Sequence, residues 1–190
     1  EVINDNPKRL HLAQKEIEFI KERESFTHII VDAFEQGLIK KRVTHNDTKL
    51  NNVMIDPTTN KAVCVIDLDT VMPGFVTDDF GDSIRFGCNT ALEDEKDLSK
   101  VTFDFELYQV YLRGYMESLH DVLTNDEIKL LPFGAKMMTL ENAIRFITDF
   151  LEGDVYFKTN YDDHNLVRAR TQIKLIMEME KKWDHLLALS

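Results

Sequence analysis

One polar stretch lies between two apolar segments of the chain and reads Thr44-His45-Asn46-Asp47-Thr48-Lys49-Leu50-Asn51-Asn52. A second acidic group follows a short apolar run, Ala62-Val63-Cys64-Val65-Ile66, which ends at Asp67. An apolar strand followed at once by a carboxylate directs that carboxylate into a site at the end of the strand. Because a tight hairpin joins the two stretches, we expect Asp47, Asn52 and Asp67 to lie close together.

These side chains suit phosphoryl transfer, which needs a carboxylate beside the attacking hydroxyl, oxygen ligands for Mg²⁺ and positive charge near the moving phosphoryl group. Asp67 and Asn52 supply the carboxylate and amide oxygens that Mg²⁺ accepts. Asp47 can orient the hydroxyl and accept its proton. Lys49 can reach the γ-phosphate of ATP as a point charge.

Each of these residues has a simpler interpretation. Isolated aspartates and asparagines are usually turn residues or helix caps, and only the joint register of Asp47, Asn52 and Asp67 with His45 favours catalysis. The His45 ring suits a scaffold that holds the loop by hydrogen bonding better than a proton-transfer role. Asp69 has three possible roles: a metal ligand, a second acid behind the metal, or a contact to substrate.

Helical periodicity dominates the rest of the chain and predicts a mainly α (α+β) fold. Gly37 and Gly153 are predicted helix ends, and Thr124 with Glu127 forms a capping box. We expect a turn at 57–60, a chain break at 72–74 and burial of strand 62–66 on both faces. Strands are predicted at 41–45, 52–56 and 62–66, and helices at 7–21, 24–39, 79–86, 102–119, 125–131, 132–151 and 162–189.

The pattern His45-x-Asp47-x-x-x-x-Asn52 resembles the catalytic loop of protein kinases and of the aminoglycoside phosphotransferase and choline kinase group. Ile66-Asp67 resembles the metal-binding strand end of that group. Longer stretches resemble the bacterial N-acetylhexosamine 1-kinases over about residues 24–180, namely 45–52, 65–74, 79–82, 153–158 and 164–168.

The resemblance implies a protein-kinase-like C-terminal lobe, a helical bundle with a small catalytic β-hairpin, that uses ATP and Mg²⁺. It implies that the acceptor is N-acetylglucosamine or N-acetylgalactosamine, phosphorylated on its anomeric hydroxyl. Arg145 and Tyr156 would hold that sugar through paired hydrogen bonds and a flat aromatic face. Without the resemblance, Arg145 would be read as a solvated surface arginine on an amphipathic helix.

The triplet Asp79-Phe80-Gly81 matches the metal-binding signature of protein kinases, but no apolar strand precedes it and it opens a predicted helix. By resemblance, Asp79 corresponds instead to an acid at the start of a helix that braces the backbone of the catalytic loop. A carboxylate at that position would also cap its own helix.

Related enzymes grip ATP with a β-rich N-terminal lobe that carries a glycine-containing loop and a strand lysine. None of the 7 glycines clusters, and residues 1–38 are predicted to be helical. We therefore expect residues 1–190 to form the catalytic and substrate lobe alone. A nucleotide lobe of ordinary domain size, roughly 150 residues, is expected upstream, and the lobe alone is expected to be inactive.

Composition narrows the partners further. A formal net charge of −11 repels nucleic acid phosphate, so we expect no nucleic-acid partner. No segment has the length of a membrane span, so we expect no membrane partner and a cytoplasmic location. The two cysteines, Cys64 and Cys88, are read as reduced and mostly buried thiols. The sequence leaves the oligomeric state open.

Two other functions remain at this stage. The first keeps the mechanism and changes the acceptor to choline, an aminoglycoside or another sugar, and the acidic surface would suit a cationic acceptor. The second is an inactive binding module that retains the kinase-like fold. The presence of Asp47, Asn52 and Asp67 together argues against that module.

Overall fold

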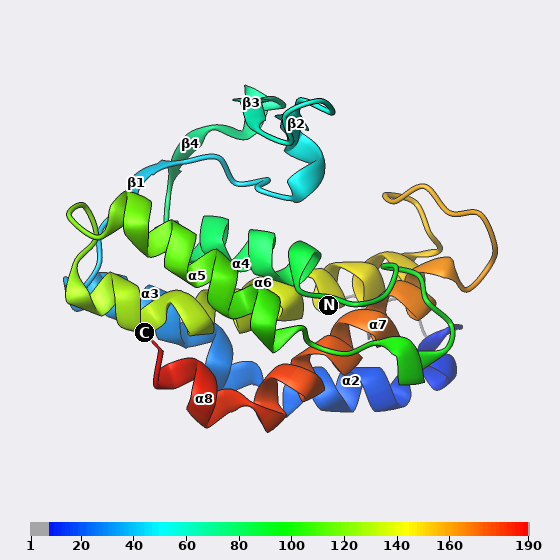
Figure 1. Cartoon of the computed structure of the whole chain (residues 1–190). Coiled ribbons are helices and arrows are strands. Elements are labelled where there is room, and N and C mark those ends of the chain that lie inside the picture. The colour runs from blue at the N-terminus through cyan, green and yellow to red at the C-terminus, as the bar shows by residue number, and fades with distance from the viewer. Residues whose placement is uncertain (1–7, 190) are drawn as a thin grey trace.

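The computed structural model describes residues 8–189 and shows a helical body with a layer of short strands on one side (Figure 1). The fold is mainly α with small two-stranded sheets, as the sequence predicts. The α-helices are α2 (Gln14–Lys21), α3 (Ile29–Glu35), α4 (Val76–Gly87), α5 (Phe105–Leu119), α6 (Asn125–Glu152), α7 (His164–Lys181) and α8 (Trp183–Leu187). Single 3₁₀ turns span Leu10–Leu12, Glu24–His28, Leu50–Asn52, Leu68–Thr70 and Leu98–Lys100.

Helix α6 is the central element of the body and begins at the predicted capping box. The Thr124 hydroxyl accepts the Glu127 N–H, and the Glu127 carboxylate accepts the Thr124 N–H in return. The helix ends at Gly153, whose φ of +101° is a left-handed conformation that glycine adopts without strain. One buried cluster, which includes Phe80, Tyr108 and Leu131, fills the space between α4, α5, α6 and α7.

The crossing of α4 and α6 requires two glycines. A Cβ on Gly81 would lie 2.3 Å from the Gly134 carbonyl oxygen, and a Cβ on Gly134 would lie 2.0 Å from the Thr77 carbonyl oxygen. Real side chains do not approach backbone so closely, so both positions must be glycine for the helix backbones to touch. This contact fixes α4, which carries Asp79, against the middle of α6.

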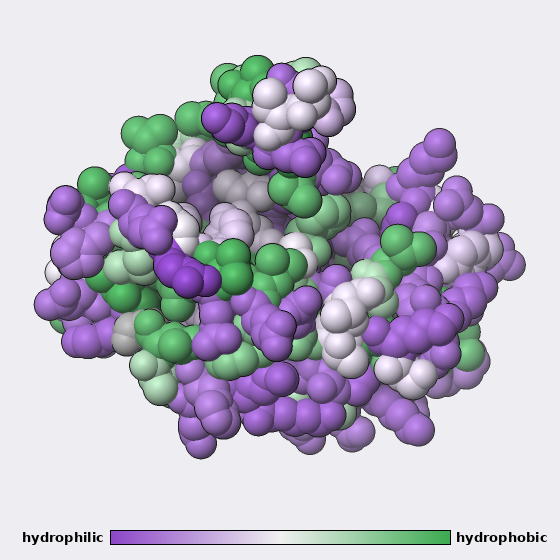
Figure 2. All heavy atoms as spheres, viewed as in Figure 1, coloured by the Kyte–Doolittle hydropathy of each residue, from purple (hydrophilic) through white to green (hydrophobic). Residues whose placement is uncertain are grey.

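The strands form two antiparallel pairs. Strand β1 (Arg42–Thr44) pairs with β4 (Met72–Gly74), and β2 (Val53–Ile55) pairs with β3 (Ala62–Val65) as the predicted hairpin. Large apolar side chains on this layer are exposed; the exposed fraction is 81% at Val43 and 66% at Val63. Figure 2 shows this hydrophobic surface at the top of the molecule.

The structure corrects the strand predictions. Strand β3 is exposed along its whole length, because no element among residues 8–189 covers it, so the expected burial on both faces is wrong. Cys64 is exposed with it, whereas Cys88 is buried and its burial raises the pKa of the thiol to about 12. The expected break at 72–74 is strand β4, in which Pro73 lies opposite Val43.

Several helix boundaries also differ from the predictions. Residues 125–152 form one helix with Pro132 inside it, where two helices were predicted. Helix α4 begins three residues early, at Val76, and the segment predicted at 24–39 is a 3₁₀ turn followed by α3, with Gly37 at φ +74° beyond its end. The last predicted helix is divided into α7 and α8. The start of the first predicted helix, at residue 7, lies outside the described residues.

Candidate functional site

The catalytic-loop candidate, residues 45–52, follows β1 directly and rests on the first turns of α4. The Asp79 carboxylate accepts the backbone N–H of His45 at 2.8 Å and that of Asn46 at 2.7 Å. One turn further along α4, the Ser83 hydroxyl donates to the Thr48 carbonyl oxygen at 2.9 Å. Asp79 therefore has the geometry that the bracing role requires, and its carboxylate is directed at the loop; it does not cap α4.

Hydrogen bonds also join this loop to residues 66–70, which carry the second acidic group. The His45 Nε2 atom lies 3.0 Å from the Ile66 carbonyl oxygen, and the Thr70 hydroxyl donates to the His45 carbonyl oxygen at 2.6 Å. The Ile66 N–H donates to the Asn52 carbonyl oxygen at 2.9 Å. These bonds place the residue before Asp67 directly against both ends of the loop.

The Asp47 carboxylate lies at the centre of the loop and has two side-chain partners. Lys49 Nζ and Asn52 Nδ2 each lie 2.8 Å from its Oδ2 atom. Burial raises the pKa of Asp47, but the hydrogen bonds from Lys49 and Asn52 outweigh that effect and the net pKa is lowered. Asp47 is therefore ionised at neutral pH. Lys49, predicted to contact phosphate, pairs with Asp47 in this structure.

Asn52 and Asp67, the two predicted magnesium ligands, both have side-chain oxygen atoms without a hydrogen-bond partner within residues 8–189. The Asn52 amide nitrogen is used by Asp47, and within residues 8–189 the amide oxygen accepts no hydrogen bond. The Asp67 side chain is exposed and has no hydrogen bond or ion pair within the same residues. Its backbone has φ +64°, a conformation that non-glycine residues adopt at a cost and that is frequent at functional sites.

Among the described residues, no group of three His, Cys, Asp or Glu side chains could hold a metal on its own. Mg²⁺ does not require such a group, because it keeps several waters and takes one or two protein oxygens together with substrate phosphates. Asp69 is exposed and, within residues 8–189, also has no side-chain hydrogen bond or ion pair.

The loop with His45 and Asp47 is thus held against the start of α4 and against the segment that carries Asp67, as the sequence resemblance to phosphotransferases implies. A sequence model of the phosphotransferase enzyme family matches residues 5–115, more than half of the chain. The chain belongs to this family. The match includes Asp47, Asn52, Asp67 and Asp79.

A cavity of about 380 Å³ lies at the C-terminal end of α6. Its lining includes Arg145, Tyr156 and Phe157. The Arg145 guanidinium carbon lies 5.8 Å from the centre of the Tyr156 ring and 5.4 Å from that of Phe157. The structure therefore brings Arg145 and Tyr156 together, although they come from a helix and a loop. Both side chains are exposed and available to a ligand.

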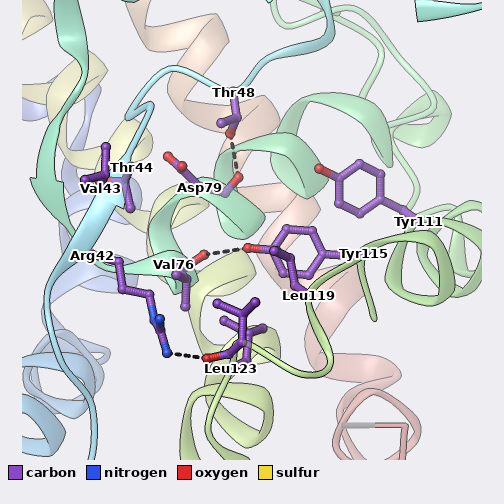
Figure 3. Close-up of a pocket in the computed structure, with 11 residues that line it drawn as sticks. Arg42, Val43, Thr44, Thr48, Val76, Asp79, Tyr111, Tyr115, Leu119 and Leu123 are labelled. Atoms are coloured by element: carbon purple, nitrogen blue, oxygen red, sulfur yellow. Dashed lines mark hydrogen bonds between the residues drawn. The ribbon is translucent and has the colours of Figure 1, made fainter. Parts of the chain in front are cut away.

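A second cavity, of about 390 Å³, lies beneath the catalytic-loop candidate between β1, α4 and α5 (Figure 3). Thr48 and Asp79 form its upper wall, and Tyr111 and Tyr115 lie beside them. No motif in the sequence indicated this cavity, because its walls come from elements far apart along the chain.

Sequence reasoning also missed two acidic residues near these sites. Asp78 lies beside Asp79 in the first turn of α4. Burial raises its pKa to about 6, and the nearby carboxylates of Glu141 and Asp79 act in the same direction. A hydrogen bond from Thr77 opposes this shift only in part. Asp149 is almost completely buried in the last turn of α6. An acid at the C-terminal end of a helix opposes the helix dipole, and that conflict is a signal in the sequence.

None of the helices in residues 8–189 combines the length and the apolar character that crossing a bilayer requires.

Proposed function

We propose that this phosphotransferase transfers the γ-phosphoryl group of ATP to a hydroxyl of a small-molecule acceptor. The observation that carries the proposal is the Asp47 carboxylate, held at 2.8 Å by both Lys49 and Asn52 in a loop that contacts the residue before Asp67. Family membership supports the reaction class, since the family is one of phosphotransferases.

In this mechanism Asp47 orients the acceptor hydroxyl and takes its proton as the oxygen attacks the γ-phosphorus and the bond to the β-phosphate oxygen breaks. Its lowered pKa makes Asp47 a weak base, which suits a reaction whose transition state is largely dissociative and needs orientation more than deprotonation. When nucleotide binds, the Lys49 ammonium group would leave its ion pair with Asp47 and contact a phosphate oxygen instead. Asn52 and Asp67 would hold Mg²⁺, which neutralises charge on the phosphates.

For the acceptor, we propose the anomeric hydroxyl of an N-acetylhexosamine, either N-acetylglucosamine or N-acetylgalactosamine. The cavity at Arg145 and Tyr156 supports a neutral sugar, because an arginine can donate paired hydrogen bonds to hydroxyl or N-acetyl oxygens while an aromatic ring covers the sugar face. The overall acidic charge instead favours a cationic acceptor such as choline or an aminoglycoside.

Turnover of the native protein with ATP and Mg²⁺ separates these acceptors when N-acetylglucosamine, N-acetylgalactosamine, choline and an aminoglycoside are compared. We expect phosphorylation of an N-acetylhexosamine, and Asp47→Ala should lower kcat by about 10²–10⁴-fold. Asp56→Asn is the matched control, because Asp56 lies in the hairpin turn and only accepts the N–H groups of Thr58 and Thr59.

Phosphorylation of choline alone would contradict the sugar proposal and leave the reaction class intact. Full turnover by Asp47→Ala would contradict the catalytic assignment. If the native protein neither turns over any acceptor nor binds Mg²⁺-ATP in titration calorimetry, the inactive binding module is the better description.

The two proposed subsites predict different kinetic changes. Asp67→Asn should raise the Mg²⁺ concentration required for half-maximal rate, because it removes the charged ligand. Arg145→Lys should raise the KM for sugar and leave the KM for ATP unchanged, because lysine cannot donate a paired fork of hydrogen bonds. A rise in the KM for ATP in Arg145→Lys would place Arg145 outside the acceptor site.

A further inference from the structure

The chain reverses direction sharply where α6 ends. Gly153 and Asp154 both have left-handed backbones, with φ of +101° and +62°. The Asp154 N–H donates to the Asp149 carbonyl oxygen at 2.8 Å and so closes the helix end. The loop that follows, residues 154–163, therefore folds back against the last turn of the helix that it has just left.

The side chain of Asp149 fixes the first part of this loop. Its Oδ1 atom accepts the N–H groups of Val155 at 2.9 Å and Tyr156 at 2.7 Å, and its Oδ2 atom accepts the N–H of Phe157 at 3.0 Å. Asn165, at the start of α7, donates a further bond to Oδ2 at 2.7 Å. Three consecutive backbone donors thus converge on one carboxylate.

The carboxylate depends on these donors. Asp149 is 2% exposed and, within residues 8–189, forms no ion pair with a lysine, arginine or histidine. A buried charge at the negative end of a helix dipole is unfavourable unless donors compensate it, and here the loop and Asn165 are the donors. The charge and the loop conformation therefore stabilise each other.

Asp149 also shares a helix face with Arg145, which lies one turn earlier on α6. Arg145 lines the cavity, and the loop held by Asp149 contributes Tyr156 and Phe157 to the same lining, with the two ring centres 5.8 and 5.4 Å from the Arg145 guanidinium carbon. Both parts of the lining are consequently anchored to a single turn of one helix.

We propose that Asp149 is the positioning residue of the acceptor pocket: its carboxylate sets the place of Tyr156 opposite Arg145 and thereby determines acceptor affinity. This inference rests on the proposed function, in which that pocket binds the acceptor. Asp149 borders the cavity but is 2% exposed, and both of its carboxylate oxygens accept hydrogen bonds from the loop, so it acts on the acceptor through the loop.

The test is Asp149→Asn in the native protein, which keeps the shape of the side chain and replaces an acceptor oxygen by an NH₂ group that faces backbone donors. Amide hydrogen exchange at residues 155–157 should accelerate by about tenfold or more, as expected for the loss of a charged hydrogen bond. The KM for sugar should rise by a similar factor, while kcat and the KM for ATP stay near their native values.

Glu127→Gln is the matched control, since Glu127 is another buried carboxylate on α6 (1% exposed) and pairs with Arg42 at 2.8 Å. It should lower the melting temperature without accelerating exchange at 155–157 or raising the KM for sugar. If Asp149→Asn does not fold, Asn165→Ala removes one donor to the same carboxylate and should shift exchange and KM in the same direction by less.

Unchanged exchange at 155–157 in a folded Asp149 variant overturns the inference. Faster exchange with an unchanged KM for sugar overturns it as well, because the loop would then be loosened without consequence for the acceptor. Absence of turnover with every acceptor is failure of the proposed function instead, and the exchange measurement then decides alone whether Asp149 fixes the loop.

Discussion

The helical body and the strand layer are held together by different forces. In the body, apolar side chains such as Phe80 and Leu131 are completely buried, and two glycines bring helix backbones into contact. In the strand layer, apolar side chains such as Val63 and Val65 are exposed, and the catalytic-loop candidate is held by hydrogen bonds to Asp79 and Thr70.

The difference separates stability from function in this chain. Packing in the body supplies most of the free energy of folding, because burial of apolar surface is the dominant favourable term. The strand layer adds little burial, so polar groups, including Asp79 on α4, determine the position of the functional groups. Substitutions in the apolar core of the body should therefore change mainly the melting temperature, and substitutions of the polar groups that hold the loop should change mainly activity.

The largest effect is expected at the crossing of α4 and α6. Gly134→Ala forces a Cβ to within 2.0 Å of the Thr77 carbonyl oxygen, so the helices must separate, and we expect a loss of about 3 kcal/mol or more in the free energy of unfolding. Gly114→Ala in α5 is the control, because its Cβ would meet nothing within 4 Å and helix propensity should add about 1 kcal/mol. Equal effects of the two variants on urea unfolding would contradict the close crossing.

The next effect concerns activity. Asp79→Asn weakens two hydrogen bonds to the backbone of the catalytic-loop candidate, so we expect kcat/KM to fall by about 10–100-fold. Asp104→Asn provides the comparison, because Asp104 also accepts a backbone N–H, that of Leu107 at 2.9 Å, and asparagine is an equally good cap. Native kcat/KM in Asp79→Asn would show that the loop needs no brace.

A smaller effect is expected for stability as a function of pH. The pKa of Asp78 is raised to about 6, so its proton is held more tightly in the folded chain than in the unfolded one. The resulting stabilisation is complete below the ordinary pKa of 3.8 and is lost as the pH rises through 6. Asp78→Asn should therefore be more stable than the native chain at pH 8, by a free energy of unfolding on the order of 2 kcal/mol.

Thermal unfolding at several pH values between 4 and 8 measures this difference. The native chain should lose stability across that range relative to Asp78→Asn. Asp121→Asn is the control, because the Asp121 side chain is 99% exposed, and its stability should follow that of the native chain at every pH. A constant difference between Asp78→Asn and the native chain at all pH values would contradict the raised pKa.

The smallest effect is expected on the strand layer. Val65→Thr replaces an exposed side chain (52%) by another β-branched residue, so the free energy of unfolding should change by less than about 0.5 kcal/mol. The same change at Val101, which is 0% exposed, buries a hydroxyl and should cost about 1–3 kcal/mol. Similar costs at both positions would mean that the layer is as well packed as the body.

The local features of the fold were predictable from the sequence. The capping box at Thr124 and the glycine end of α6 depend on residues within one helical turn, and the β2–β3 hairpin depends on a short turn. Strand β4 was missed because it pairs with β1, which is distant along the chain, and because Pro73 indicates a break. Helix α6 continues through Pro132 because its packing against α4 outweighs the missing hydrogen bond.

The parts of the candidate site that lie in a sequence motif could be predicted, and the parts that depend on tertiary contacts could not. His45, Asp47, Asn52, Asp67 and Asp79 lie within one motif-bearing region, and their roles stay proposals. The exposure of β3 could not be foreseen, because an apolar run does not reveal whether another element covers it. The bonds from the loop to Asp149 also could not be foreseen, because backbone donors leave no mark in the sequence.

The glycine crossing has a consequence for how the protein can vary. Helix α4 carries Asp79 near its start, and helix α6 carries Arg145 and Asp149 near its end. The two helices are in close backbone contact at Gly81 and Gly134. Because this contact is so close, one helix cannot shift along the other, and it therefore fixes the position of Asp79 relative to Arg145 and Asp149. If the proposed function holds, the side chains of the loop at 154–163 can vary and admit a different acceptor without moving the proposed catalytic groups that Asp79 supports.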